Sequence, residues 1–320
     1  MFEHAFPFDP TYGYDLTALL AIKPPEPVSD FEAFWRDTYR QTLAVAPELE
    51  MEEDASRSTE TRQVYKAYFT GLGGFRCGAW VTIPRGQKVV RAVIESHGYG
   101  GRDTPADLAH GEPAVVFAPV ARGFGISSRP EIPNNSKHHV VYGIESRETY
   151  IHRFCVTDIW SAISAVLEKW PELRGKVEYS GGSFGGGIGA MAIPWDDRIV
   201  KGFLDVPSFG NHPLRVTMQC TGSGQAVLER VAQEPELLTT VLPYYDAAVS
   251  ARFIRVPTLV APALFDPSVP PPGQFSVYNA IPEAYRRLHV KTSGHFVEPN
   301  DLTKQRLMLE RRQQWAVSND

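Results

Sequence analysis

The fold of this chain is decided by the stretch Val177-Glu178-Tyr179-Ser180-Gly181-Gly182-Ser183-Phe184-Gly185. Its first four residues are typical of a short strand, and the residues from 185 to 193 predict a helix. Between them lies Gly-x-Ser-x-Gly, a pattern in which a serine occupies a sharp strand-to-helix turn. Small residues are needed there, because the backbone bends sharply and the helix must approach the sheet closely. The stretch therefore predicts a reactive Ser183, with a glycine-rich turn around an inert serine as the alternative.

Strand-like and helix-like segments alternate along most of the chain. Two segments rich in β-branched and aromatic residues flank the turn Gly71-Leu72-Gly73-Gly74 and predict a hairpin over residues 64–84. A helical period over residues 149–170, ended by Pro171, predicts a long helix. This alternation is typical of a mostly parallel sheet with helices on both faces, and with the serine elbow it predicts an α/β-hydrolase fold. The remaining predicted strands cover residues 89–95, 114–120, 177–180, 200–205, 258–265 and 287–290.

The 320 residues predict one large domain with a short N-terminal extension. Residues 1–62 are expected to form the extension, in which a helix over 30–42, begun by Ser29 or Asp30, packs on the main domain. Residues 63–320 are expected to form the catalytic domain. Within that domain residues 126–147 lack periodicity, which predicts a long irregular loop of the kind that is often functional.

A serine hydroxyl is a weak nucleophile, so it needs an imidazole to take its proton and a carboxylate to orient that imidazole. Asp266 ends an apolar run, where the edge of the sheet would direct it toward the elbow. His295 follows the last predicted strand, whereas its rival His289 lies within the strand pattern. The sequence thus predicts a triad of Ser183, Asp266 and His295. The alternatives are a helix-capping aspartate before Pro267 and a surface-loop histidine.

An ester-cleaving serine also needs two backbone N–H groups that face the developing oxyanion. The residue after the nucleophile, Phe184, is expected to supply one of them. The loop His97-Gly98-Tyr99-Gly100-Gly101 follows a predicted strand, and the amide of Tyr99 is the candidate for the second. A plain tight turn is the alternative for this loop.

Composition argues against several other classes of protein. The chain has 32 Lys and Arg against 37 Asp and Glu and no basic cluster interleaved with aromatics, so a nucleic-acid partner is not expected. Three widely spaced cysteines, Cys77, Cys155 and Cys220, fit neither a disulfide framework nor a metal cluster and are expected to be reduced and buried. The first ten residues lack the pattern of a signal peptide, and no run approaches the roughly 18 apolar residues of a membrane span. No membrane association and a cytoplasmic location are therefore expected.

Several motifs together resemble carbohydrate esterase family seven, the acetyl xylan esterases and cephalosporin C deacetylases. The likeness extends from residues 30–35 near the start to the loop of His295. It implies the same Ser183, Asp266 and His295 triad and places His97, Gly98, Arg122, Phe124, Pro207 and Phe296 in or behind the substrate pocket. The other markers are Arg122-Gly123, Gly185-Gly186-Gly187, Leu204-Asp205-Val206-Pro207, Phe265-Asp266, Pro270-Pro271 and Val277-Tyr278-Asn279.

Three polar positions of the family's signatures are phenylalanine in this chain, namely Phe124, Phe184 and Phe296. We hypothesise that the three rings replace one polar network by apolar packing, since a half-satisfied buried network is costly. The hypothesis requires the three rings to lie close together. The loop after Arg122 also looks shorter than the family's insertion, which affects the expected shape of the pocket entrance.

The resemblance implies a serine carboxylesterase that removes small acyl groups, above all acetyl groups, from sugars or cephalosporin-type alcohols. It further implies a small-molecule ester substrate, no cofactor and no metal, and a homo-oligomer that is often a hexamer. Two alternatives remain. The same triad could serve a longer-chain esterase or a peptidase, and the fold could persist in a non-catalytic binding protein.

Overall fold

A nine-stranded sheet forms the centre of the computed structural model, which describes residues 2–106, 113–297, 303, 307–308, 310–311 and 313–315. The strand order is β1-β2-β3-β5-β4-β6-β7-β8-β9, and all pairs from β5 to β9 along this order are parallel, whereas β1, β2, β3 and β5 pair antiparallel. The predicted hairpin and the mostly parallel sheet are therefore confirmed. The strands are β1 Glu50–Glu53, β2 Arg62–Thr70, β3 Arg76–Pro84, β4 Arg91–Ser96, β5 Ala114–Pro119, β6 Val177–Gly182, β7 Ile199–Asp205, β8 Thr258–Ala261 and β9 Arg286–Leu288.

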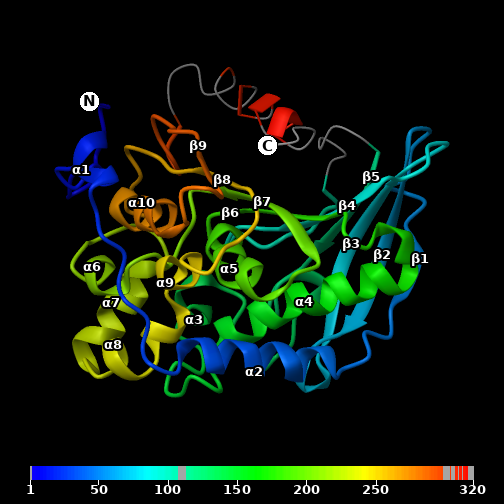
Figure 1. Cartoon of the computed structure of the whole chain (residues 1–320), viewed down its shortest axis with the longest axis horizontal. Coiled ribbons are helices and arrows are strands. Elements are labelled where there is room, and N and C mark those ends of the chain that lie inside the picture. Colours follow the sequence, from blue (N-terminus) through cyan, green and yellow to red (C-terminus); the bar gives the residue numbers. More distant parts are fainter. Residues whose placement is uncertain are drawn as a thin grey trace.

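Most described helices lie below the sheet in the view of Figure 1, with α4 and α5 against it and α2 outside α4. The opposite face is covered by C-terminal residues, because Phe203 of β7 packs against Trp315 while its neighbour Leu204 points into the main core. Adjacent strand residues face opposite sides, so β7 is covered on both faces. The helices are α1 Leu16–Leu20, α2 Phe31–Leu43, α3 Ser136–His139, α4 Ile151–Lys169, α5 Phe184–Ala192, α6 His212–Arg215, α7 Gly224–Gln233, α8 Leu237–Thr240, α9 Ala247–Ala251 and α10 Pro271–Ala280.

The helix α2 packs against α4 and the segment that carries Tyr244. The indole of Trp35 is fully buried, donates to the Tyr244 carbonyl at 2.9 Å and meets the Trp160 ring edge-on at 6.0 Å. The same part of the chain also contributes β1 to the sheet, an element that the sequence pattern did not predict. The strand could not be predicted from its sequence, because acidic residues are depleted in strands and β1 contains Glu50, Glu52 and Glu53. The domain boundary at residue 62 stays a prediction.

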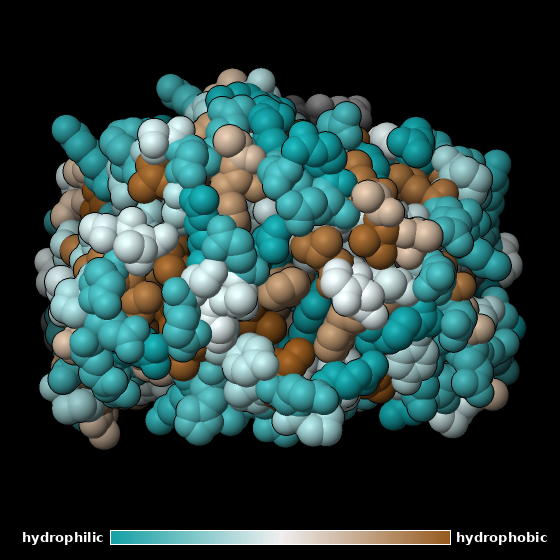
Figure 2. Space-filling model, turned by 90° about the horizontal axis from the view of Figure 1, so that it is seen from below, coloured by the Kyte–Doolittle hydropathy of each residue, from teal (hydrophilic) through white to brown (hydrophobic). Residues whose placement is uncertain are grey.

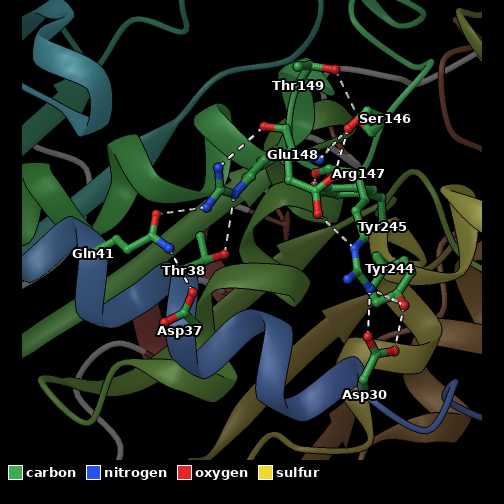
Figure 3. A network of polar contacts seen from close by, with 11 residues as sticks. Asp30, Asp37, Thr38, Gln41, Ser146, Arg147, Glu148, Thr149, Tyr244 and Tyr245 are labelled. Atoms are coloured by element: carbon green, nitrogen blue, oxygen red, sulfur yellow. Dashed lines mark hydrogen bonds and ion pairs between the residues drawn. The ribbon is translucent and has the colours of Figure 1, made fainter.

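A polar network joins α2 to the end of the predicted irregular loop, residues 126–147 (Figure 3). The Arg147 guanidinium contacts both the Asp30 carboxylate, at 2.7 Å, and the Tyr244 hydroxyl. Arg153 of α4 donates to Thr38 and Gln41 of α2. This loop contains turns, bends and the single-turn helix α3. Its end is therefore fixed against the helical layer.

The surface seen from below in Figure 2, where α2 lies, is mainly hydrophilic, with hydrophobic residues scattered among the polar ones. Within the described ranges, no helix is both long and apolar enough to cross a membrane. Cys77, Cys155 and Cys220 are free and buried, as predicted.

Candidate active site

The predicted elbow is present between β6 and α5. Ser183 follows the last residue of the strand and precedes the first residue of the helix, with φ at 55° and ψ at −115°. A positive φ at a residue with a Cβ is strained and persists only where the surroundings enforce it. The surroundings are close here, since a Cβ on Gly186 would lie 2.9 Å from the Cα of Pro207. Pro207 therefore packs behind the elbow, and the turn holds the serine at the carboxyl edge of the sheet.

The structure brings Ser183, His295 and Asp266 together. His295 Nε2 lies 2.9 Å from Ser183 Oγ, and His295 Nδ1 lies 2.8 Å from Asp266 Oδ2. A carboxylate can only accept, so Nδ1 carries the proton and Nε2 is left to accept from the serine hydroxyl. This is the geometry that a nucleophile, a general base and an orienting carboxylate require. The rival His289 instead follows β9, where its backbone N–H donates to the Val260 carbonyl at 2.9 Å.

Asp266 is fully buried and uses both of its carboxylate oxygens. Oδ2 accepts from His295 and from Gln274 Nε2, whereas Oδ1 accepts from the backbone N–H groups of Ser268 and Val269, each at 2.9 Å. The helix-capping alternative considered for Asp266 is wrong, because the next helix, α10, has Pro270 as its N-cap residue and no side-chain cap. Burial acts to lower the pKa of His295, but the hydrogen bond and charge of Asp266 outweigh it and raise that pKa above 6.5. Gln274 was not identified from the sequence.

A family model described as acetyl xylan esterase (AXE1) matches residues 15–307 of the chain. The chain belongs to the acetyl xylan esterase family. It is accordingly a carboxylic ester hydrolase of the serine hydrolase type, which confirms the predicted family and enzyme class. The match covers the region that carries the elbow, the buried aspartate and the histidine loop.

Solved structures of other proteins share the fold of this acetyl xylan esterase family member. An acetyl xylan esterase from Paenibacillus sp. superposes with a TM-score of 0.82 at 21% identity, over 93% of this chain and 99% of that one. Acetyl xylan esterase 1 from Thermoanaerobacterium sp. gives 0.77 at 22% identity, over 97% and 100%. The acylaminoacyl peptidase of Pyrococcus horikoshii gives 0.59 at 12% identity, over 80% of this chain and 41% of that one. The predicted α/β-hydrolase fold is confirmed.

The loop predicted to complete the oxyanion hole lies directly beside the elbow of this acetyl xylan esterase family member. A Cβ on Gly98 would sit 3.7 Å from the Cβ of Ser183, and the rings of Tyr99 and Phe184 have their centroids 4.3 Å apart. In the part of the chain that the structure describes, the amides of Tyr99 and Phe184 donate no hydrogen bond to protein. Two donors next to the nucleophile are therefore available to a ligand.

Two buried histidines hold the side chain of Tyr99. Its hydroxyl lies 3.2 Å from His139 Nδ1 and 3.1 Å from His152 Nε2, and His139 Nε2 lies 2.8 Å from the Arg122 carbonyl. The carbonyl can only accept, so His139 carries its proton on Nε2, Tyr99 donates to His139, and His152 donates to Tyr99. This leaves His152 Nδ1 as a buried acceptor without a partner. Burial lowers the pKa of both histidines, to about 4 for His139, so both are neutral at pH 7.

Replacing Tyr99 with phenylalanine is expected to lower kcat for a short ester about tenfold while leaving KM within about twofold. The change removes the link between the two histidines, so the loop that carries the Tyr99 amide loses its anchor while the amide itself remains. Steady-state kinetics on 4-nitrophenyl acetate would measure the effect. Tyr142→Phe, at an exposed tyrosine, is the control. A loss confined to KM would contradict a role in positioning the oxyanion donor.

Residues 2–12 cover the loops that carry Asp266 and His295. The backbone N–H of Asp266 donates to the Pro10 carbonyl at 3.1 Å. Phe296, next to the histidine, packs its ring 5.5 Å from that of Phe2 and 5.0 Å from that of Phe265. The segment thus contacts the loops of two residues of the predicted triad.

The hypothesis that Phe124, Phe184 and Phe296 form one cluster is wrong. The ring centroids of Phe124 and Phe184 lie 6.0 and 4.3 Å from that of Tyr99, and both rings also contact His97 and His139. Phe296 belongs to the separate cluster formed with the N-terminal residues. The physical reason is that Phe296 follows the histidine on the far side of the triad, where residues 2–12 supply its apolar partners.

His97 and Arg122 were expected in or behind the pocket, and both lie behind it. His97 is buried, its Nε2 accepts from the Ala121 amide at 2.9 Å and its Nδ1 donates to the Gly98 carbonyl, so it fixes the loop before Tyr99. Arg122 forms a buried ion pair with Asp158 at 2.7 Å. The polar groups of both side chains already bond to other protein groups, which indicates structural roles.

A cavity that the sequence did not predict is lined by residues bonded to Ser183 and Asp266. Ser208 lines it and donates its N–H to the Ser183 carbonyl at 3.1 Å, and Val269 lines it next to the buried aspartate. The cavity is lined also by Phe209, His212, Arg215 and Gly224. Among the residues described, no group of three or more His, Cys, Asp and Glu side chains is placed to hold a metal ion.

Proposed function

We propose that Ser183, His295 and Asp266 are the catalytic triad of this ester hydrolase. His295 Nε2 takes the hydroxyl proton as Ser183 Oγ attacks the ester carbonyl, and the imidazolium that forms is stabilised by Asp266. It then gives the proton to the leaving alcohol, and a water molecule activated by His295 releases the acid from the serine. The observation that carries this proposal is the continuous hydrogen-bonded path from Ser183 Oγ to the Asp266 carboxylate.

The amides of Phe184 and Tyr99 would bind the oxyanion of the two tetrahedral intermediates. Support comes from their position beside Ser183 and from the lack of protein acceptors for either N–H in the described structure. Donors fixed before the reaction begins stabilise the developing charge without reorganisation. No step of this mechanism requires a cofactor.

The substrates we propose are acetyl esters of sugars or related alcohols. This rests on membership in the acetyl xylan esterase family, and two similar structures carry that same name. The structural likeness to an acylaminoacyl peptidase reflects the shared fold and keeps a peptidase as the second candidate. A cytoplasmic location and a homo-oligomer, such as a hexamer, remain predictions.

The experiment that tests this function measures hydrolysis of 4-nitrophenyl esters from acetate to octanoate, together with labelling by a fluorophosphonate. Activity confined to short chains and a single label on Ser183 are the expected results. An aminoacyl 4-nitroanilide tests the peptidase alternative in the same assay. Failure to hydrolyse any ester, with no labelled serine, would favour the non-catalytic alternative.

The kcat/KM of the enzyme is expected to rise with pH through a midpoint above 6.5, because only neutral His295 can accept the serine proton and its pKa is raised. His97 and His139, with pKa lowered to about 4 by burial, do not titrate in this range. A pH profile of kcat/KM between pH 5 and 9 checks the midpoint. A midpoint below that of free histidine would contradict the dominant influence of Asp266.

A further inference from the structure

His295 has a left-handed backbone conformation, with φ at 46°. A residue with a Cβ is strained in this region, so its neighbours must hold it there. The Gly294 N–H before it donates to the Phe265 carbonyl at 2.8 Å. The Phe296 ring after it meets the Phe265 ring edge-on, with the centroids 5.0 Å apart. The strained histidine therefore lies between two neighbours that are both attached to the residue before Asp266.

The Phe296 ring receives two more aromatic partners from the start of the chain. The Phe2 ring lies 5.5 Å from that of Phe296 and 5.0 Å from that of Phe265, and the Phe6 ring lies 6.2 Å from that of Phe296. We call Phe2 and Phe6 the aromatic clamp. Aromatic pairs at these distances attract each other and bury apolar surface. Without the clamp, less apolar contact would oppose a rotation of the His295 backbone out of its strained conformation.

Polar contacts attach the segment that carries the clamp to the main domain. The Pro10 carbonyl accepts from the Asp266 N–H at 3.1 Å, and the Tyr12 hydroxyl donates to the Gln219 carbonyl at 2.6 Å. Between them the chain turns, because the Asp9 carbonyl accepts from the Tyr12 N–H at 2.9 Å. These hydrogen bonds do not depend on the packing of the rings. The clamp is thus part of a segment that is fixed next to the loop of Asp266.

Both halves of this contact are features in which the chain departs from the family pattern. The family model matches residues 15–307, so Phe2 and Phe6 lie outside the matched region. Phe296 is one of the three phenylalanines at positions where the family's signatures are polar. A phenylalanine in this place needs apolar partners, and the clamp supplies them.

We propose that the aromatic clamp is a positioning element for catalysis, which holds Phe296 and thereby keeps the imidazole of His295 aligned with its two partners. The proposal rests on the triad assigned above. The clamp residues act through Phe296 and need no contact with the substrate. Alignment matters because a general base must lie within hydrogen-bond reach of the proton that it takes. A displacement of about 1 Å can lower the rate about 100-fold.

The test replaces both clamp residues in the full chain, as Phe2→Ala/Phe6→Ala, and measures hydrolysis of 4-nitrophenyl acetate. We expect kcat to fall about tenfold or more while KM stays within about twofold. The pH midpoint of kcat/KM should also fall toward 6.5, because an imidazole that leaves Asp266 loses the contact that raises its pKa. A clamp that only stabilised the fold would lower the melting temperature without moving this midpoint.

Three variants serve as controls for the clamp. Phe8→Ala removes a ring of the same segment that stacks on Phe6 and Tyr12 and, among the described ring contacts, meets neither Phe265 nor Phe296, so kcat should stay within about twofold. Phe2→Leu/Phe6→Leu keeps apolar bulk and should recover most of the lost kcat. In a Phe296→Ala background, which should itself lower kcat, Phe6→Ala should have no further effect, because its partner is already gone.

The possible outcomes separate the clamp from the proposed function. A wild-type kcat and pH midpoint in the double alanine variant, or a lower melting temperature alone, would overturn the clamp and leave the esterase assignment intact. If that variant folds poorly, Phe6→Ala alone should still lower the midpoint, and an unchanged midpoint would overturn the clamp equally. Wild-type hydrolysis of the ester and its loss in Ser183→Ala test the proposed function itself.

Discussion

Replacing Ser183 with alanine is expected to lower kcat on a short acyl ester by about 10⁴- to 10⁶-fold. The serine Oγ is the atom that attacks, and no other hydroxyl in the described structure lies on the path to His295. The elbow geometry should survive, because the backbone contacts of residue 183 do not involve its side chain. A small residual rate is expected from the oxyanion donors acting on a bound water molecule. Single-turnover and steady-state assays with 4-nitrophenyl acetate would measure the loss.

Ser161→Ala is the matched control for this variant. Ser161 is a buried serine on α4 whose hydroxyl has no hydrogen-bond partner, so its loss should leave both activity and melting temperature close to those of wild type. Thermal unfolding of the two variants separates chemistry from stability. Activity of Ser183→Ala within tenfold of wild type would contradict the assignment of the nucleophile.

Replacing Asp266 with asparagine is expected to lower kcat about 10⁴-fold. An amide has no charge to stabilise the imidazolium, and it can present an N–H to His295 that favours the wrong tautomer. The variant should also be less stable, because Oδ1 and Oδ2 together accept from Gln274 and two backbone N–H groups. Since Asp266 raises the pKa of His295, the pH midpoint of the residual activity should move downward.

Asp205 provides the control for this prediction, because it is a second carboxylate close to the elbow. It ends β7, accepts from Lys291 Nζ at 2.9 Å and contributes to raising the pKa of His295 from a greater distance. Asp205→Asn should cost less than about tenfold in kcat, since it touches neither Ser183 Oγ nor His295. An equal loss in both variants would show that the orienting role is shared between the two carboxylates.

The elbow, the approach of Asp266 and His295 to Ser183 and the mostly parallel sheet could be predicted because each depends on local chemistry. Glycines around Ser183 mark a turn that no larger residue permits, and apolar runs mark strands whose carboxyl ends share one edge. The contact between Asp266 and His295 could be expected because both residues follow strands whose carboxyl ends lie at the same edge of the sheet. The same logic failed for β1, whose glutamates are tolerated because the strand lies at the edge of the sheet.

Contacts between distant segments could not be predicted in the same way. Phe296 was assigned to the wrong cluster because its partners are at the opposite end of the chain. The link from His139 through Tyr99 to His152 joins three segments whose register depends on the packing of α4.

The hydrogen bond from Asp266 to the Pro10 carbonyl has a consequence for synthesis of the chain. Pro10 and Asp266 must meet before the loop that carries Asp266 has all its contacts. During translation, Pro10 therefore has no partner for this hydrogen bond until residue 266 has left the ribosome. Contacts of such long sequence separation form late, because loop closure must come first. The central strands can pair while translation continues, whereas the segment around Asp266 can reach its final contacts only after residue 266 has emerged.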